Sequence, residues 1–358
     1  MGNTRFLFSD GVLSRSPDVP PVSSFLQSRP GAYTTTRTHN HGACVLFWER
    51  HIDRLLDSAR ILLYSDRELL FGSEGLSARP FPSMNSTPWE SRARSLVCDS
   101  LGEVLPVPLM EEDGEELAIT ILLSGNLDRL GDPRKDLEFL DVHLHVDGYV
   151  PTGFGAKGSG AHLALVGRGR EAASAKYSDW VRRRKHLQRF RPCSATELLL
   201  SNDGDHVLEG SVTNFFTVCR REDNENELKD GLASCFEVQT APVSDGVLPG
   251  VIRQLVIEVC LSKGIPFREV APSWAMRELW EEAFITSSLR LLQHVEAIEV
   301  PVTWEHVESR SSYDDLDWTK KSFKSHPGMI TTMIQAEIMK RASLEGYPVS
   351  LLRKTRII

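Results

Sequence analysis

An ordered set of reactive and hydrogen-bonding residues lies between Lys176 and Ser288. It contains a lysine, then Glu209 followed by small and hydroxyl-bearing residues, then a Leu248-Pro249-Gly250 turn, and finally Thr286-Ser287-Ser288. Holding pyridoxal 5'-phosphate requires such a set. An amine attaches the aldehyde, an acid keeps the pyridine nitrogen protonated, and clustered N–H and O–H groups receive the phosphate. The order of these residues therefore predicts a pyridoxal phosphate site.

Three lysines between residues 150 and 209 could supply the amine, namely Lys157, Lys176 and Lys185. An amine attacks a carbonyl only after it loses its proton, which desolvation or nearby positive charge favours. Taken alone, a lysine in loop-like sequence is more often an ordinary exposed charge. The residues themselves leave the choice among the three open.

Glu209 follows a polar turn and the short strand pattern 207–208, so we expect its side chain to emerge from a sheet edge into a cavity. A carboxylate there can pair with a pyridinium nitrogen and make the ring an electron sink. The alternative is a surface glutamate at a strand end. The small and hydroxyl-bearing residues at 210–214 favour the first interpretation, because they let the backbone approach the flat face of a ring.

Two further segments offer donors for a phosphate. After Pro249-Gly250, apolar residues recur at helical spacing over 251–262, which leaves the N–H groups of Val251 and Ile252 unpaired at the amino end of a helix. Ser287 and Ser288 follow the predicted strand 283–285 and can add hydroxyl and N–H donors. Together these segments predict a phosphate-binding site.

The elements that must position these residues differ between the two halves of the chain. In the first half, 31–38 and 43–48 read as a hairpin, and 51–63 as an amphipathic helix with Arg54 off its apolar stripe. In the second half, short turns join most of the strands, which is typical of an antiparallel or barrel-like sheet. Those strands are predicted at 161–166, 197–201, 207–208, 214–218 and 235–239, with helices at 251–262 and 273–280.

The glycine-rich stretch 148–160 separates these halves and reads as a linker. It could instead be a glycine-rich phosphate cradle, but it lacks a flanking strand–turn–helix pattern. We therefore predict a two-domain α/β (α+β) fold. It has a small N-terminal α/β domain over 1–147, a linker over 148–160, and a larger C-terminal, cofactor-binding, barrel-like β domain with helices over 161–358.

Four segments resemble the fold-type IV, or class IV, pyridoxal phosphate enzymes. This group contains branched-chain aminotransferases, D-amino acid aminotransferases and aminodeoxychorismate lyases, and the resemblance covers most of residues 31–300. The segments that carry it are His51–Leu55, Glu197–Leu200, Glu209–Phe216 and Ser244–Arg253.

The resemblance implies a role for individual residues. It selects Lys176 as the Schiff-base lysine, because only this lysine places Glu197–Leu200 in register before Glu209. It implies that Arg54 and Ser288 bind the phosphate. It also implies that Tyr33 and Arg37 line the substrate pocket. We expect no metal site.

The implied activity is an aminotransferase that moves an amino group between an amino acid and a 2-oxo acid through a Lys176 aldimine, in a homodimer. Two alternatives stay open: a lyase of the aminodeoxychorismate type, and a noncatalytic protein that retains the cofactor site. The chain departs from the family pattern after the lysine. Asp179 and Val181 stand where members commonly carry asparagine three residues, or tyrosine five residues, after it.

Composition limits the partners and the compartment. The formal net charge of −8 gives no general electrostatic reason to bind nucleic acid or an anionic membrane. The basic run 182–191 has interleaved apolar residues and reads as a helix with a basic face. The six cysteines form no CxxC pair, so we expect no disulfides and no zinc site. With neither a signal segment nor a membrane span, the expected location is the cytoplasm.

Overall fold

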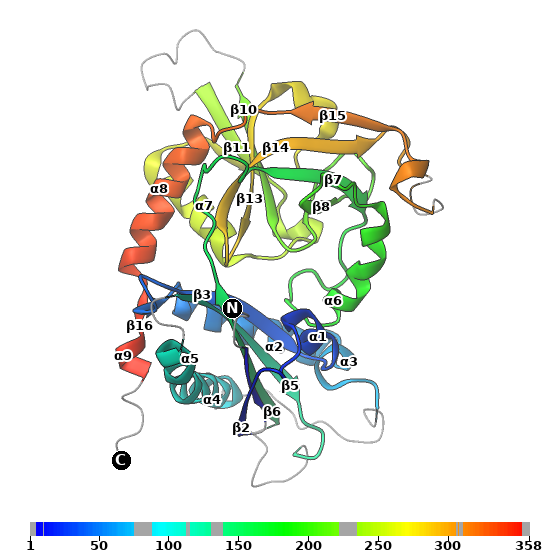
Figure 1. Cartoon of the computed structure of the whole chain (residues 1–358). Helices are drawn as coiled ribbons and strands as arrows, with labels where there is room; N and C mark the ends of the chain where they lie inside the picture. The colour runs from blue at the N-terminus through cyan, green and yellow to red at the C-terminus, as the bar shows by residue number, and fades with distance from the viewer. Residues whose placement is uncertain are drawn as a thin grey trace. The chain divides into compact units, whose positions relative to one another are not determined.

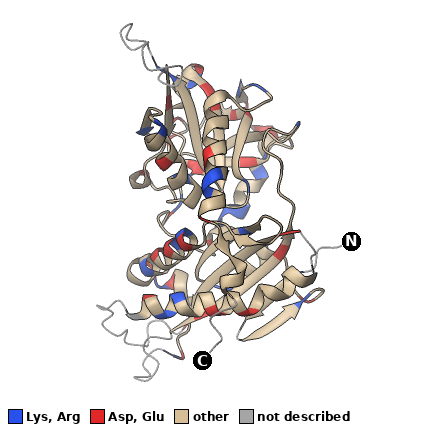
Figure 2. Cartoon of the chain, turned by 90° about the vertical axis from the view of Figure 1, so that its left-hand side faces the viewer, with Lys and Arg blue, Asp and Glu red and all other residues tan. Residues whose placement is uncertain are grey.

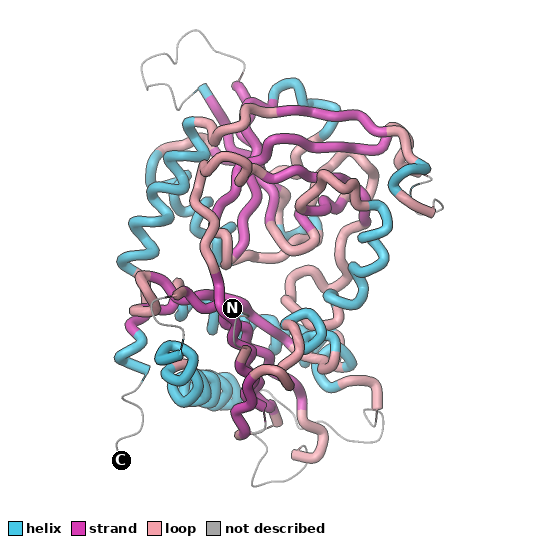
Figure 3. The backbone as a smooth tube through the Cα atoms, in the orientation of Figure 1, coloured by secondary structure: helices cyan, strands magenta, loops and turns pink. Residues whose placement is uncertain are grey.

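The computed structural model describes residues 5–9, 11–74, 88–111, 115–129, 139–221, 235–305, 307 and 311–352. The chain divides into two compact units, each containing strands and helices (Figures 1 and 3). The first unit groups Met1–Pro151, Ala175–Arg183 and Ala342–Ile358. The second groups Thr152–Ser174 and Arg184–Arg341.

The first unit is built on a seven-stranded sheet. Its strand order is β16-β4-β3-β5-β6-β1-β2, and all pairs are antiparallel. The strands are β1 (Phe6–Ser9), β2 (Val12–Arg15), β3 (Ala32–His39), β4 (Cys44–Val45), β5 (Glu116–Gly125), β6 (Leu140–Tyr149) and β16 (Tyr347–Pro348). The helices are α1 (Val22–Gln27), α2 (Trp48–Ser65), α3 (Glu68–Phe71), α4 (Pro88–Val104), α5 (Pro106–Glu111), α6 (Trp180–Arg183) and α9 (Val349–Leu352).

Helix α2 packs on β3 and buries two kinds of side chain. Ile52, Leu55 and Leu62 are inaccessible to solvent, and burying an aliphatic side chain of this size contributes about 1.5–3 kcal/mol. His51 and Arg54 are buried as well. Arg54 is therefore off the apolar stripe as predicted, but it is not a solvated charge.

The second unit is a closed barrel of six strands with added strands at its side. The closed ring is β10-β13-β14-β7-β8-β9, and the pairing of Glu209 with Asn214 joins β9 back to β10. The ring strands are β7 (Ala161–Gly167), β8 (Glu197–Leu200), β9 (Glu209–Gly210), β10 (Asn214–Arg220), β13 (Trp280–Ser287) and β14 (Leu291–Pro301). The added strands are β11 (Phe236–Thr240), β12 (Phe267–Glu269) and β15 (Trp318–Ser322).

Two long helices accompany this barrel. Helix α7 (Val251–Lys263) packs on β12 and β13, and α8 (Met329–Leu344) begins in this unit (Figure 1). The barrel core holds large aromatic residues, among them Phe215 and Trp280, whose rings lie 6.0 Å apart. A mixed α/β fold with a barrel-like β unit agrees with the predicted fold class.

The compact units differ from the predicted domain division. The prediction assigned everything beyond residue 160 to one domain, whereas Ala175–Arg183 and the stretch from Ala342 group with the first unit. The reason is strand pairing. The N–H of Tyr33 donates to the carbonyl of Lys176 (2.9 Å), and β16 pairs with β4.

Acidic and basic residues are interspersed along the ribbon of each unit (Figure 2). Some of them form exposed pairs of opposite sign, such as Arg220 with Glu281. Exposed pairs of this kind contribute about 0–1 kcal/mol each. Among the described helices, none is long and apolar enough to cross a membrane.

Candidate functional site

Strand β3 positions the two predicted substrate residues. Tyr33 and Arg37 lie four residues apart on β3 and therefore share one face of the sheet. Tyr33 packs in a cluster with Phe25 and Leu122, and Arg37 donates from Nη1 to the carbonyl of Thr38 (3.1 Å). Arg37 is only 5% exposed, and burial lowers the pKa of its guanidinium.

Arg54 of helix α2 contacts the opposite face of β3. Its Nη2 donates to Oγ1 of Thr34 (2.7 Å), and the same hydroxyl lies 2.8 Å from Nδ1 of His51. His51, Arg54 and Ser58 follow each other at helical spacing on α2, and all three are buried. A polar stripe of α2 therefore faces β3.

Lys176 lies on the segment that pairs with the start of β3. Its carbonyl accepts the N–H of Tyr33, and its own N–H donates to Oγ of Ser58 (3.1 Å). Its Nζ lies 4.7 Å from the centroid of the Tyr33 ring, which is cation–π distance. The structure thus brings Lys176, Tyr33 and Arg54 together in the first unit, through Ser58 and Thr34.

The residues that depart from the family pattern have structural roles here. Asp179 accepts hydrogen bonds from Nε of Arg183 (2.6 Å) and Nε of Arg182 (2.8 Å). Burial acts to raise the pKa of Asp179, but these two arginines outweigh burial and lower it. Val181 is buried in the cluster that contains Phe25 and Tyr33. The two positions therefore anchor the lysine segment.

In the second unit, Glu209 is held from three directions. Nε of Arg170 donates to its Oε1 (2.7 Å), and the N–H of Leu248 donates to its Oε2 (3.0 Å). Nδ2 of Asn214 is 3.3 Å from the same Oε2. The exposed fractions of the Arg170 and Glu209 side chains are 4% and 3%. Glu209 is therefore a buried, ion-paired carboxylate, not a surface residue.

Asn214 connects Glu209 to the predicted phosphate donors. Its Nδ2 also donates to the carbonyl of Leu248 (2.9 Å), two residues before Gly250, and it is the cross-strand partner of Thr286. Gly250 is the N-cap of α7, and no side chain caps this helix. The structure thus brings Glu209, the N–H groups of Val251 and Ile252, and the end of β13 to one edge of the barrel.

Several polar groups at this edge could receive a ligand. The hydroxyls of Thr213 and Thr286 are buried and have no hydrogen-bond partner among the described residues. A side chain at position 250 would collide with the amide oxygen of Asn214, so glycine keeps the start of α7 open. Ser287 accepts the N–H of Arg290 (3.3 Å), and Ser288 is half-buried after β13. These donors suit an oxyanion such as phosphate.

The predicted residues thus fall into two groups, one in each unit. Lys176, Arg54, Tyr33 and Arg37 belong to the first, and Glu209, Val251, Ile252, Ser287 and Ser288 belong to the second. Sequence reasoning missed His51, Ser58 and Thr34 in the first group. In the second group it missed Arg170, which no pattern in the Gly167–Arg170 loop distinguishes from a surface arginine.

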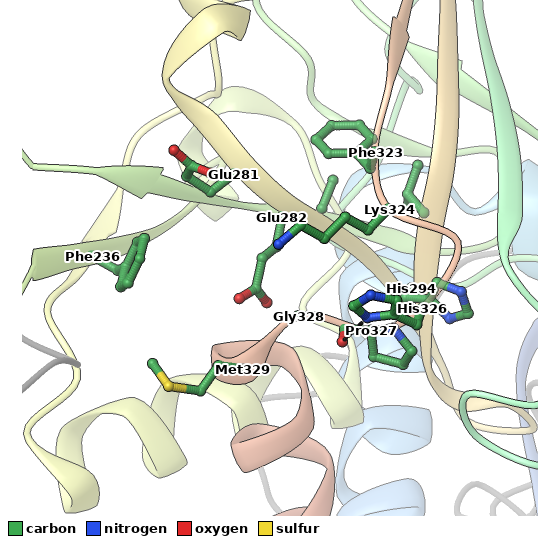
Figure 4. Close-up of a pocket in the computed structure, with 12 residues that line it drawn as sticks. Phe236, Glu281, Glu282, His294, Phe323, Lys324, His326, Pro327, Gly328 and Met329 are labelled. Carbon is green, nitrogen blue, oxygen red and sulfur yellow. Dashed lines mark hydrogen bonds between the residues drawn. The ribbon is translucent and has the colours of Figure 1, made fainter.

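A separate cavity of about 230 Å³ lies in the second unit (Figure 4). Phe236, Glu282, His294 and Phe323 line it, and none of the predicted site residues does. Glu282 accepts the N–H groups of residues 330 (3.1 Å) and 331 (2.8 Å), so its carboxylate caps α8. This cavity is not part of either group.

No metal site emerges from the described part of the chain, where no three histidine, cysteine, aspartate or glutamate side chains are arranged to hold an ion.

We expect His51 to make folding acid-sensitive. Burial, then the charges of Arg54 and Lys176, hold the pKa of His51 well below its usual value. The unfolded state therefore binds a proton at a higher pH than the folded state does, and folding stability falls as pH drops below about 6.5. Urea unfolding at pH 7.5 and pH 5 should show His51→Gln losing less stability than wild type, by up to about 1.4 kcal/mol per pH unit.

His206→Gln is the matched control for this prediction. A hydrogen bond to Asp203 raises the pKa of His206, so its contribution is present at low pH and is lost as pH rises. The loss of unfolding free energy between pH 7.5 and pH 5 should therefore be at least as large in His206→Gln as in wild type. If the unfolding free energies of His51→Gln and wild type changed equally between pH 7.5 and pH 5, His51 would not be the titrating group.

Comparisons with known proteins agree on one family. The family model described as amino-transferase class IV matches residues 109–298, which is more than half of the chain. No curated protein sequence is significantly similar to the chain.

Solved structures share the fold at low sequence identity. The branched-chain aminotransferase of Thermoproteus uzoniensis, solved with norvaline, is 18% identical, with a TM-score of 0.59 and coverage of 97% of this chain and 99% of that one. The fold IV transaminase of Curtobacterium pusillum is 17% identical (TM-score 0.57, coverage 96% and 99%). An aminotransferase from Brucella abortus bound to the cofactor PLP is 16% identical (TM-score 0.58, coverage 95% and 99%).

Proposed function

Because the chain belongs to the class IV aminotransferase family, we propose that the predicted residues of each unit take part in binding pyridoxal phosphate and an amino acid substrate. The protein is a pyridoxal phosphate-dependent aminotransferase of fold type IV. Its cofactor is pyridoxal phosphate (PLP), which is also bound in the Brucella abortus structure. The observation that carries the residue assignment is the buried carboxylate of Glu209 beside the uncapped start of α7.

The second unit provides groups that fit both ends of the cofactor. When bound, the cofactor supplies an electron sink for the charge left when the substrate Cα loses its proton. Glu209 would hold a proton at the pyridine nitrogen. The N–H groups of Val251 and Ile252 would bind the phosphate, together with Ser287 and Ser288. The unpartnered Thr286 hydroxyl supports this fit, since a buried donor without a partner costs about 1–3 kcal/mol.

The first unit would supply the reactive amine and the substrate contacts. Lys176 would attach the cofactor aldehyde and, once released, move a proton at the substrate Cα. Arg54 would bind the phosphate, and Thr34 orients its guanidinium. Tyr33 and Arg37 would contact the amino acid. The sheet supports all of these roles, because β3 contributes or contacts each of the four residues.

We also propose the wider setting of the reaction. The substrates would be an amino acid donor and a 2-oxo acid acceptor, and the enzyme would act as a homodimer, as the family resemblance implies. We propose the cytoplasm as its location. The six cysteines are all free, which supports a reducing compartment.

An absorption spectrum tests this function. Purified protein supplied with pyridoxal phosphate should show a bound-cofactor band near the edge of the visible range. One member of a panel of L- and D-amino acids should convert that band to the spectrum of the aminated cofactor, and a 2-oxo acid should restore it. Absence of the band with added cofactor would contradict the proposal. A band that no amino acid converts would favour the noncatalytic alternative.

A further inference from the structure

Arg170 lies in direct contact with Glu209 and has no role in the assignment above. Besides its 2.7 Å bond to Oε1 of Glu209, it donates from Nη2 to the carbonyl of Ala173 (3.2 Å). Both charged side chains are almost fully buried. A buried ion pair offsets its desolvation cost only with good geometry and further hydrogen bonds. This pair has both, so Arg170 fixes a positive charge beside the carboxylate.

The contacts of Glu209 also limit where a ligand can bind it. An ionised carboxylate offers about four acceptor positions. Arg170 occupies one on Oε1, while Leu248 and Asn214 take two on Oε2. Counting only partners within the described residues, about one position remains. A ring nitrogen bound at this position would share the carboxylate of Glu209 with Arg170.

We propose that Arg170 is a positioning residue that orients Glu209 and keeps the shared proton on the ring nitrogen of the cofactor. This inference rests on the proposed function. Coulomb energies fall with distance. Arg170 would therefore stabilise the carboxylate anion that it contacts more than it would destabilise a pyridinium that is farther from it. The balance favours carboxylate and pyridinium over carboxylic acid and neutral pyridine, and the pyridinium is the better electron sink.

The test uses the full chain loaded with pyridoxal phosphate labelled with ¹⁵N in the ring, observed by NMR. In wild type the ring-nitrogen signal should lie at the protonated position. In Arg170→Gln, which keeps a donor but loses the charge, we expect the signal to move toward the unprotonated position. We also expect kcat to fall about 10- to 100-fold, with little change in KM. Arg170→Lys, which keeps the charge, should retain the wild-type signal.

Arg253→Gln is the matched control. Arg253 is a buried arginine of the same unit, paired with Glu269 (2.5 Å) and the carbonyl of Ala241 (2.9 Å). Its loss should lower stability without moving the nitrogen signal.

Each outcome decides between the two proposals. Bound cofactor with the same signal in Arg170→Gln and wild type would overturn the role of Arg170 and leave the aminotransferase function intact. No bound cofactor in wild type would overturn both. If Arg170→Gln does not fold, Arg170→Lys decides, because a charge-conserving variant that loses the protonated signal contradicts the proposal.

Discussion

Replacing Lys176 with alanine should lower transamination by at least about 10³-fold and abolish the absorption band of the covalently attached cofactor. The reason is that one amine is assigned two tasks, attachment of the aldehyde and proton movement at the substrate Cα. A positioned general base alone is worth about 10²- to 10⁴-fold. Alanine removes only the side chain beyond Cβ. The backbone bonds of Lys176 to Tyr33 and Ser58 should therefore persist, and the fold with them.

Lys157 and Lys185, the two alternative lysines between residues 150 and 209, provide the controls. Lys157→Ala and Lys185→Ala should retain the band and most of the activity, since both side chains are exposed. The measurement is the spectrum of each purified variant with added cofactor, followed by single-turnover reaction with an amino acid. Loss of the band in Lys157→Ala or Lys185→Ala, with the band kept in Lys176→Ala, would reassign the amine.

Elements with strong periodicity were predictable from sequence. The apolar repeat at 51–63 corresponds to α2, and the repeat at 251–262 corresponds to α7. Element ends were less predictable. The strand predicted at 43–48 covers only Cys44–Val45 in the structure. It ends there because Phe47 adopts a left-handed conformation (φ 48°) and α2 begins at Trp48. The predicted helix 273–280 is a 3₁₀ helix over Trp274–Leu279, and Trp280 already belongs to β13.

Site residues that belong to a short local motif were predictable from the sequence. A residue whose role depends on a partner far away in the sequence was not. Glu209 and the start of α7 follow from short segments with a recognisable order. Arg170 could not be found in this way, because its partner lies 39 residues later and is brought to it by the barrel. The burial of Arg54 has the same cause. Periodicity shows that Arg54 leaves the apolar stripe, but only the packing of α2 on β3 shows that the other side is buried too.

Replacing Glu209 with glutamine should have the second large effect, and it should act on both activity and stability. Glutamine carries no negative charge and therefore cannot stabilise a protonated ring nitrogen as a carboxylate does. We expect kcat to fall about 10²-fold or more. The change also leaves the buried guanidinium of Arg170 without its counter-charge. Breaking a buried pair from one side costs about 3–5 kcal/mol.

A double-mutant cycle separates these two effects. Arg170→Met removes the other partner of the pair, and the double variant Arg170→Met/Glu209→Gln removes both charges. Because the double variant buries no unpaired charge, its loss of unfolding free energy should be smaller than the sum of the two single losses. Its activity should stay as low as that of Glu209→Gln, since the carboxylate is still absent.

Urea unfolding and steady-state kinetics on the same four proteins measure both quantities. If stability and activity recovered together in the double variant, Glu209 would be a structural ion-pair partner and not a cofactor ligand. If stability recovered alone, the chemical role of the carboxylate would be independent of the stability of the barrel edge that holds it. That second result is the one the geometry favours, because Oε2 of Glu209 is bound by Leu248 N–H at the approach to α7, on the side away from Arg170's bond to Oε1.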